Sequence, residues 1–185
     1  MKISCRSFDE YYLDFFKSYE NKVKVLDYGC GDARLIGKLV EAGFPDVRGV
    51  DVVKLWPRES DIYCDCIDSD TILNGDYDVV ISNQVLEHVE NKALYLSNIF
   101  SLLNDQGKAI ISFPLKEIII EPHLFLPFCH RLKPGSIYNR VLLFIVSFFK
   151  YTNNWFYKAA VDWVENRVKF LTDDVFYISK KDFEK

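Results

Sequence analysis

Apolar positions in the first two thirds of the chain form two alternating kinds of segment. Some are short runs of strand-forming residues, as in Tyr77–Asn83, and others carry apolar residues at helical spacing, as at Leu35, Ile36 and Leu39. Strands are expected at residues 23–26, 47–53, 62–66, 77–83 and 108–114, and helices at residues 8–19, around 35–40 and at 92–103. Strands that alternate with helices predict an α/β fold built on a parallel sheet.

The stretch Val23–Val53 combines a strand, a glycine turn, a helix and a second strand. The first apolar run ends in Asp27, Gly29 and Gly31 follow it, and Asp51 lies near the end of the second run. Glycines let a backbone turn tightly and approach a ligand closely. A carboxylate at the end of the second strand can accept both hydroxyls of a ribose. The stretch therefore predicts a site for a nucleotide-like ligand.

Two ligand classes compete for this unit. A dinucleotide fingerprint, G-x-G-x-x-G, would need glycine where the chain has Arg34. The chain instead has Asp27, Gly29, Gly31 and Ala33, a pattern that resembles the first motif of the class I S-adenosylmethionine-dependent methyltransferases. Acidic groups and backbone carbonyls suit the ammonium and sulfonium of that cofactor, whereas they would repel a pyrophosphate. The methyltransferase interpretation is therefore preferred.

Two later segments match the same family in the same order. YDVVISNQVLEHV (77–89) is similar to the family's fourth-strand motif, and LLNDQGKAIISFP (102–114) to its last shared motif. The chain is identified as a member of this family. Membership implies S-adenosyl-L-methionine as cofactor and a Rossmann-like, doubly wound parallel sheet of order 3-2-1-4-5, with the cofactor at its C-terminal edge. The resemblance implies cofactor contacts from Asp27, Gly29, Cys30, Gly31, Asp51, Val52, Asp65, Cys66, Asn83 and Gln84.

Some candidate contacts have a simple structural alternative. Asp65 lies in a segment rich in acidic residues and could be a loop carboxylate without a ligand. Tyr11 and Tyr12 lie on the expected N-terminal helix, which in this family often closes over the cofactor. They could equally form an aromatic face of the core. Both alternatives stay open at the level of the sequence.

Three histidines are the candidate catalytic residues. His88 could remove a proton from a hydroxyl acceptor, since imidazole titrates near neutral pH, or it could bond a backbone group at a helix start. His123 and His130 lie in a proline- and aromatic-rich segment after the fifth strand, where the family places acceptor-binding insertions. They are candidates for acceptor contact or for the base, or for part of a lid packed on the core. Their spacing does not indicate a metal site, and no metal is expected.

The 185 residues are 49% hydrophobic, which suits a single domain with a substantial core. We expect a cofactor-binding core at residues 1–121 and an acceptor-side helical region at residues 122–185. The core holds 13 Lys and Arg against 21 Asp and Glu, whereas the second region holds 10 against 6. Because the whole chain is acidic, nucleic acid is not expected as a partner.

The number of cysteines and the N-terminal sequence indicate the cellular compartment. The five cysteines are an odd number, and the charged, aromatic N-terminus does not resemble a secretory leader. Reduced thiols in a cytoplasmic protein are therefore expected. Cys64 and Cys66 are too close together for a usual zinc knuckle and are interpreted as small buried residues on a strand.

The run Tyr138–Tyr151 is apolar, with one basic residue near each end. It is too short to span a bilayer. As a helix that is apolar nearly all round, it must be buried, pair with another chain or enter a membrane interface. Burial in the domain is the first expectation. A peripheral membrane contact or a homodimer through residues 137–163 is the alternative, so the protein is expected to be cytoplasmic or membrane-peripheral.

The chain is therefore expected to be an S-adenosylmethionine-dependent methyltransferase that acts on a small or lipid/glycan-linked acceptor. Transfer to an oxygen, nitrogen or carbon nucleophile needs alignment, removal of water and, for a hydroxyl, a base. In this family two more strands normally follow the region of residues 170–185, and the chain stops before them. The alternative is a truncated, non-catalytic methyltransferase-like protein that binds the cofactor or a partner chain.

Overall fold

The computed structural model describes residues 8–19, 22–68, 71, 75–150 and 156–184. Cys5 and Tyr151 lie outside these residues. Contacts divide the chain into two compact units: residues 1–86 and 91–112 form the first, and residues 87–90 and 113–185 form the second. The second unit thus consists of the chain after residue 112, together with residues 87–90.

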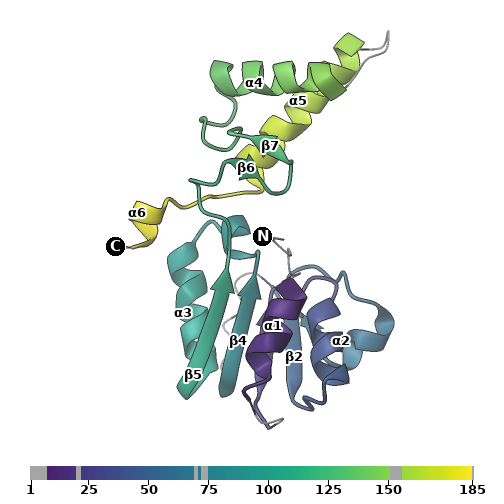
Figure 1. Cartoon of the computed structure of the whole chain (residues 1–185), viewed down its shortest axis with the longest axis vertical. Coiled ribbons are helices and arrows are strands. Elements are labelled where there is room, and N and C mark those ends of the chain that lie inside the picture. The colour runs from purple at the N-terminus through teal and green to yellow at the C-terminus, as the bar shows by residue number, and fades with distance from the viewer. Residues whose placement is uncertain (1–7, 20–21, 69–70, 72–74, 151–155, 185) are drawn as a thin grey trace, which may run out of the picture. The chain divides into compact units, whose positions relative to one another are not determined.

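A five-stranded parallel sheet forms the centre of the first unit (Figure 1). The chain leaves β1 toward one edge of the sheet and later leaves β4 toward the other, so the C-terminal ends of these two strands flank the point where α/β sheets bind ligands. The expected sheet order is confirmed. The strands are β1 (Val25–Tyr28), β2 (Val47–Asp51), β3 (Cys64–Cys66), β4 (Tyr77–Asn83) and β5 (Leu103–Ser112), in the order β3-β2-β1-β4-β5.

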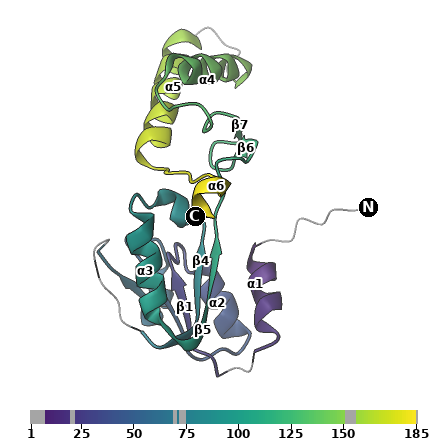
Figure 2. The same cartoon turned by 90° about the vertical axis from the view of Figure 1, so that its left-hand side faces the viewer.

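Helices cover both faces of this sheet (Figure 2). α1 (Phe8–Phe16) and α2 (Arg34–Glu41) lie on one face, and α3 (Lys92–Leu102) lies on the other. Right-handed crossovers require this arrangement, because the chain crosses the sheet in opposite directions from β1 to β2 and from β4 to β5. Two short 3-10 turns, η1 (Arg58–Ile62) and η2 (Leu86–His88), follow β2 and β4.

The core of the first unit lies between the sheet and the helices α1 and α2. Val25 and Val79 of the sheet and Leu39 of α2 are fully buried, as expected for strands covered on both faces. Tyr12 is buried in the same cluster, whereas Tyr11 is 59% exposed. Tyr12 therefore belongs to the aromatic core face that the sequence allowed, and a cofactor contact of Tyr11 stays a prediction.

The fifth strand begins earlier than the sequence predicts. Residues 104–107 are expected to form the turn that ends the preceding helix, yet β5 already pairs at Leu103. Leu103 pairs with Tyr77 and Lys108 pairs with Val79, so β5 uses five residue steps where β4 uses two. The expected turn is present as an irregularity inside the strand, because its residues leave the ladder while both flanks stay paired.

The helix α3 buries only one of its faces. Tyr95, Ile99 and Leu102 are buried, but Leu94 is 47% exposed and Phe100 is 79% exposed. The many apolar residues between 92 and 103 predict a buried helix, and that prediction is wrong for the outer face. The reason is that α3 packs on the sheet from one side, and apolar residues that point away from the sheet find no further layer in the first unit.

The second unit combines a short hairpin with helices (Figure 1). β6 (Ile120–Glu121) and β7 (Leu126–Pro127) pair antiparallel, and α4 (Ile137–Lys150) packs on α5 (Phe156–Asp173) before the chain reaches α6 (Lys180–Phe183). The expected helical, aromatic-rich region is present, although the sequence did not indicate the hairpin. The buried cluster of the unit comprises Leu126, Cys129, Leu143, Trp163, Val164, Val168, Leu171 and Val175.

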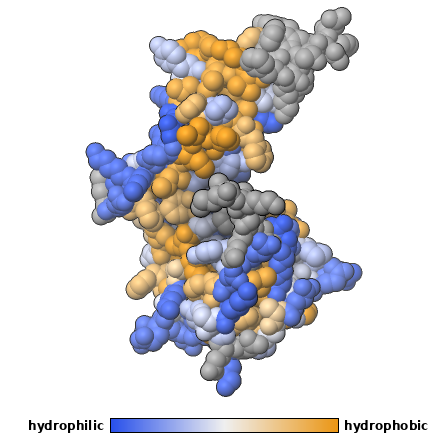
Figure 3. Space-filling view, viewed as in Figure 1, coloured by the Kyte–Doolittle hydropathy of each residue, from blue (hydrophilic) through white to orange (hydrophobic). Residues whose placement is uncertain are grey.

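The helix α4 exposes an apolar face, which corrects the first expectation of burial. Its buried side includes the polar Asn139, whose Nδ2 donates to the Cys129 carbonyl at 2.8 Å. Within the second unit α4 packs on one neighbouring helix, α5, which covers only part of it, and hydrophobic surface gathers on the uncovered side (Figure 3). Five large apolar residues on that side are between 38% and 75% exposed: Ile137, Tyr138, Val141, Phe144 and Ile145. None of the described helices is long and apolar enough to cross a membrane.

The described cysteines differ in exposure, which predicts their reactivity. Cys66 is exposed on β3, so the expected burial is wrong for it, whereas Cys30, Cys64 and Cys129 are buried. Burial raises the pKa of all three buried thiols, that of Cys129 to about 12. At pH 8 only about 1 in 10⁴ Cys129 thiols is then ionised, and the thiolate is the reactive form.

We therefore expect one fast-reacting thiol when a Cys5→Ser variant is treated with an aromatic disulfide reagent at pH 8. The other three thiols should react at least about 100-fold more slowly, because they are shielded and largely protonated. A Cys66→Ser substitution in the same background should abolish the fast phase. Two or more fast equivalents in the folded protein would contradict the described burial.

Candidate functional site

The glycine turn between β1 and α2 is bonded to the end of β2. The N–H groups of Gly29 and Cys30 both donate to the Val50 carbonyl, at 2.8 and 3.1 Å. The N–H of Gly31 donates to Oδ2 of Asp51 at 2.8 Å. The turn and the strand end therefore form one hydrogen-bonded unit, in which the position of the turn fixes the position of the carboxylate.

Asp51 ends β2 with its carboxylate already oriented. Besides the bond from Gly31, its Oδ1 accepts the N–H of Val53 at 3.1 Å. An ionised carboxylate offers about four acceptor positions, so about two remain for a ligand. A fixed carboxylate with two remaining acceptor positions is what the two hydroxyls of a ribose require.

The turn leaves room for a ligand at Gly31 and none at Gly29. A Cβ on Gly29 would lie 2.3 Å from Cγ2 of Val85, whereas a Cβ on Gly31 would meet no atom within 4 Å. Asp27, at the C-terminal part of β1, is only 4% exposed. An open stretch of backbone beside acidic groups fits the cationic methionyl end of S-adenosylmethionine, because carboxylates and carbonyls stabilise its positive charges.

The residues that end β4 form the neighbouring part of the same edge. Oδ1 of Asn83 accepts the Ser112 hydroxyl at 2.7 Å, and the Gln84 N–H donates to the Ser112 carbonyl at 2.7 Å. Gln84 and Ala33 have φ values of 57° and 59°, in the left-handed region that favours glycine. Such strained residues gather at functional sites, where the surrounding structure holds them in place. Their position here favours a binding role for this edge.

The strand β3 extends the edge beyond β2. Val50 pairs with Asp65 and Asp51 pairs with Cys66, so both β3 residues lie beside the end of β2. Asp65 and Cys66 are exposed, Val52 is 55% exposed, and the Cys66 thiol donates to the Val52 carbonyl at 3.6 Å. The structure therefore gathers these three predicted residues at one strand end, and their contacts with the cofactor stay predictions.

Two of the candidate catalytic histidines lie together in the second unit. Nε2 of His88 is 3.2 Å from Nε2 of His123, and the ring centroids are 4.9 Å apart. Nδ1 of His88 lies 2.6 Å from the Asp174 carbonyl, and Nδ1 of His123 lies 2.8 Å from Oε1 of Glu121. Oε1 of the buried Glu87 lies 3.9 Å from Nε2 of His123. One ligand atom each from Glu87, His88 and His123 falls within 4.8 Å of the others, so the three could hold a metal ion.

Glu121 is the buried anchor of this cluster, with no exposed surface. Burial alone would raise the pKa of its carboxyl, but hydrogen bonds from the Tyr177 hydroxyl, the Leu124 amide and His123 hold that pKa below its ordinary value. Burial and the bond to Glu121 raise the pKa of the Tyr177 hydroxyl in turn. Glu121 is therefore a charged acceptor, and the groups around it donate.

The third candidate, His130, has a different environment. It is 4% exposed, its Nε2 donates to the Lys116 carbonyl at 3.2 Å, and its ring packs 5.0 Å from that of Tyr177. Burial lowers its pKa, because a buried site disfavours the charged imidazolium. These contacts match the packed-lid alternative that the sequence allowed, and a role of His130 in the reaction stays a prediction.

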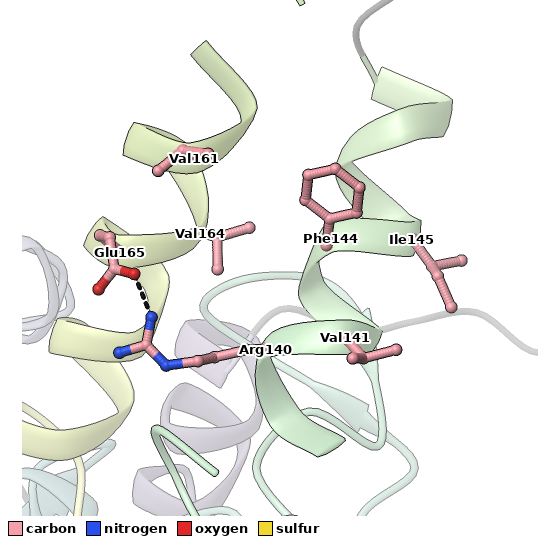
Figure 4. Close-up of a pocket in the computed structure, with 7 residues that line it drawn as sticks. All are labelled: Arg140, Val141, Phe144, Ile145, Val161, Val164 and Glu165. Carbon is pink, nitrogen blue, oxygen red and sulfur yellow. Dashed lines mark hydrogen bonds and ion pairs between the residues drawn. The ribbon is translucent and has the colours of Figure 1, made fainter. Parts of the chain in front are cut away.

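An apolar groove lies between α4 and α5 and has a volume of about 270 Å³ (Figure 4). The Arg140 guanidinium pairs with the Glu165 carboxylate across it and is the main polar feature of its lining. The apolar side chains come from both helices: Val141, Phe144 and Ile145 from α4, and Val161 and Val164 from α5. The groove adjoins the exposed face of α4, so the second unit offers a continuous apolar surface.

Comparison with known protein families decides the identity of this fold. A family model described as a methyltransferase domain matches residues 5–157, which include the glycine turn, Asp51 and both later motifs. The chain belongs to the class I S-adenosylmethionine-dependent methyltransferases. The family implies S-adenosylmethionine as the cofactor, in agreement with the geometry of the Gly31 and Asp51 unit.

Curated relatives and solved structures agree with this family. The ubiquinone biosynthesis O-methyltransferase of Rickettsia typhi is 32% identical over 117 aligned positions, and the match covers 56% of this chain and 47% of that protein. The enzyme of the same name from Rickettsia bellii is 33% identical over 116 aligned positions, and the match covers 55% of this chain and 48% of that protein. The chain therefore spans about half the length of the curated relatives it matches.

Among solved structures, the plantazolicin methyltransferase BpumL in complex with a triazolic desmethylPZN analog and SAH superposes with a TM-score of 0.52. The two sequences are 14% identical, and the match covers 96% of this chain and 57% of that one. At this identity the similarity shows the Rossmann-like methyltransferase fold and nothing more specific.

Sequence reasoning missed the acidic residues around the histidine pair. Glu87 directly precedes His88, and Glu121 lies two residues before His123, so a search for acidic neighbours of the candidate histidines would have found both. Tyr177 bonds Glu121 from 56 residues away. No local sequence signal indicates that contact.

Proposed function

We propose that this chain carries the cofactor site and the acceptor-side region of a methyltransferase that methylates a hydroxyl group of a small, lipid-linked acceptor. The observation that carries the proposal is the hydrogen-bonded unit of Gly31 and Asp51 at the ligand-binding edge of the sheet. The names of the rickettsial relatives, which place an O-methyltransferase in ubiquinone biosynthesis, favour oxygen as the methylated atom.

When bound, S-adenosylmethionine supplies a methyl group on a cationic sulfur, and transfer forms an O–C bond while the S–C bond breaks. Asp51 would accept the ribose hydroxyls, and Asp27 with the open backbone at Gly31 would stabilise the charged methionyl end. Asn83 and Gln84, fixed by Ser112, would border the same end. This chain thereby contributes alignment, which supplies most of what such a transfer needs.

A hydroxyl acceptor must also lose its proton, and the histidine pair is the candidate group for that step. His88 follows β4 after only four residues, and its Nε2 faces Nε2 of His123. Both rings use Nδ1 for structural hydrogen bonds, which leaves Nε2 for chemistry. His130 is a weaker candidate, because its Nε2 is committed to the Lys116 carbonyl.

The apolar surface of the second unit supports an acceptor with a hydrophobic tail. The groove between α4 and α5 and the exposed face formed by Val141, Phe144 and Ile145 could receive such a tail or contact the membrane that holds it. On this proposal the protein is cytoplasmic and membrane-peripheral through residues 137–163. A homodimer through the same face is the alternative, and the molar mass in solution distinguishes the two.

The test compares acceptors that carry a phenolic hydroxyl with and without an isoprenoid tail, using radiolabelled S-adenosylmethionine. We expect methylation of the hydroxyl and a KM at least about tenfold lower for the tailed acceptor, because burial of only two methylenes contributes about 1.6 kcal/mol. The corresponding methyl ether should accept no label. An Ile145→Ser variant should lose part of the preference for the tail and keep its rate on the tailless phenol.

Transfer to an amine but not to the hydroxyl would overturn the proposed acceptor class. If no acceptor is methylated and the chain also fails to bind S-adenosylhomocysteine, the alternative of a non-catalytic methyltransferase-like chain that binds a partner protein is supported instead. If the chain binds the cofactor product without any transfer, a cofactor-binding role is favoured.

A further inference from the structure

The histidine pair presents two nitrogen lone pairs to each other. Nδ1 of His88 lies 2.6 Å from the Asp174 carbonyl, which can only accept, so that nitrogen carries the hydrogen. Nδ1 of His123 likewise donates to the Glu121 carboxylate at 2.8 Å. In the neutral rings each Nε2 therefore holds a lone pair, and the two Nε2 atoms are 3.2 Å apart. Two facing lone pairs at this distance repel unless a positive centre lies between them.

The separation of the two nitrogens fits a metal ion better than a shared proton. Zinc binds imidazole nitrogen at about 2.0–2.1 Å, and tetrahedral geometry then places two such nitrogens about 3.3 Å apart. A separation of 3.2 Å lies at the long end of the range of about 2.7–3.2 Å for N–H hydrogen bonds, which also prefer a nearly linear geometry. Here Nε2 of His88 and Nε2 of His123 are 3.2 Å apart and the rings are inclined by 77°.

A carboxyl group completes the set of ligands. The Glu87 side chain is fully buried, and its Oε1 lies 3.9 Å from Nε2 of His123. One atom each from Glu87, His88 and His123 lies within 4.8 Å of the other two. Three protein ligands leave one position of a tetrahedral ion open for water or a hydroxyl, which is the arrangement of catalytic rather than structural zinc sites.

The outer hydrogen bonds of the cluster are those that metal-binding histidines use. Such histidines donate their second ring N–H to a carbonyl or carboxylate, which fixes the tautomer and orients the ring. His88 makes this bond to the Asp174 carbonyl, and His123 makes it to Glu121. Glu121 is in turn held by the hydroxyl of Tyr177 and the amide of Leu124. Both ligand rings are therefore oriented by partners that do not take up the ligand atoms.

We propose that Glu87, His88 and His123 bind one divalent cation of the Zn²⁺ type. Two nitrogens and one oxygen suit Zn²⁺, Co²⁺ or Fe²⁺, whereas Mg²⁺ and Ca²⁺ prefer oxygen ligands. This proposal differs from the sequence-based expectation of no metal. The two imidazoles come from residues 35 apart in the chain, so no short sequence motif indicates the site. The proposal that the cation binds does not depend on the proposed function. Only a role of the cation in methyl transfer rests on that function. In that role the two Nε2 atoms would be ligands and would no longer serve as the base, the cation would lower the pKa of an acceptor hydroxyl at its open position, and water would take the proton.

The experiment uses the full chain without a histidine tag, freed of metal by a chelator and titrated with Co²⁺. We expect one Co²⁺ per chain with the strong visible absorption of four-coordinate cobalt, and displacement of that absorption by Zn²⁺. His123→Ala should weaken Co²⁺ binding at least about 100-fold, and Glu121→Gln, which alters an outer partner, about 10- to 100-fold. Glu90→Gln removes an exposed carboxylate from the same segment and should leave binding unchanged.

Circular dichroism of every variant serves as the folding control, because the cation site lies in the second unit, and calorimetric binding of S-adenosylhomocysteine tests the first unit separately. Equal Co²⁺ affinity in wild type and His123→Ala, or the weak absorption of a six-coordinate surface ion, would overturn the site. So would an ¹⁵N spectrum in which the two imidazoles share a proton and do not respond to Co²⁺. Failure of cofactor binding or methyl transfer with the cobalt spectrum intact would instead count against the proposed function.

Discussion

Replacing Asp51 by asparagine is expected to weaken binding of S-adenosylhomocysteine by at least about 100-fold. On the proposed binding mode the carboxylate accepts hydrogen bonds from the ribose hydroxyls, and hydrogen bonds to a charged acceptor contribute about 1.5–3 kcal/mol each. A total loss of about 3 kcal/mol corresponds to about a 100-fold change in Kd. The amide would also turn a donor toward the N–H of either Gly31 or Val53, which now donate to the two oxygens. The variant therefore disturbs the turn as well as the ribose contact.

The matched control is Asp46→Asn, which removes the same charge beside the opposite end of β2. That variant should bind with the wild-type Kd, because the distance to the ligand-binding edge makes its charge irrelevant in physiological salt. Isothermal titration calorimetry measures both affinities, and circular dichroism shows that both variants are folded. An Asp51→Asn protein that binds within about threefold of wild type would refute the assigned cofactor edge.

The first unit could be predicted closely from the sequence because its signals are local. β4 coincides with the expected residues, since a continuous apolar run covered by helices on both faces has few alternatives. The predicted cofactor edge rests on glycines and acidic residues at strand ends, and the parallel pairing places those ends together. The exact course of β5 was missed, because an irregularity inside a ladder depends on its partner strand.

The second unit was predicted less well because its features depend on distant contacts. The exposed face of α4 reflects how few elements cover it, which an apolar sequence does not reveal. The pairing of His88 with His123 depends on the hairpin of β6 and β7 and on the Asp174 carbonyl, none of which has a signal near the histidines. Beyond the segments that resemble the family, candidate catalytic residues could be named from the sequence. The clusters that these residues form with other side chains could not be predicted.

A second large effect is expected from Gly29→Ala, which should lower the free energy of unfolding by about 2–5 kcal/mol. Gly29 has a φ of 95°, which costs a residue with a Cβ about 1–2 kcal/mol. The added Cβ would also lie 2.3 Å from Cγ2 of Val85, so the turn or the segment after β4 must shift, at about 1–3 kcal/mol more. Because the turn is bonded to Val50 and lies next to Gly31, such a shift also displaces the Asp51 partner.

Gly37→Ala is the matched control, because the same substitution is expected to raise the free energy of unfolding there. Gly37 lies inside α2, and a Cβ there would meet no atom within 4 Å. Alanine in an exposed helix interior should therefore raise the free energy of unfolding by about 0.5–1 kcal/mol. Urea denaturation followed by circular dichroism measures both variants, and calorimetry with S-adenosylhomocysteine should show weaker binding for Gly29→Ala alone. If the two alanines shift the urea midpoint alike, the close contact between the cofactor turn and Val85 is absent, because helix propensity alone would then govern both changes.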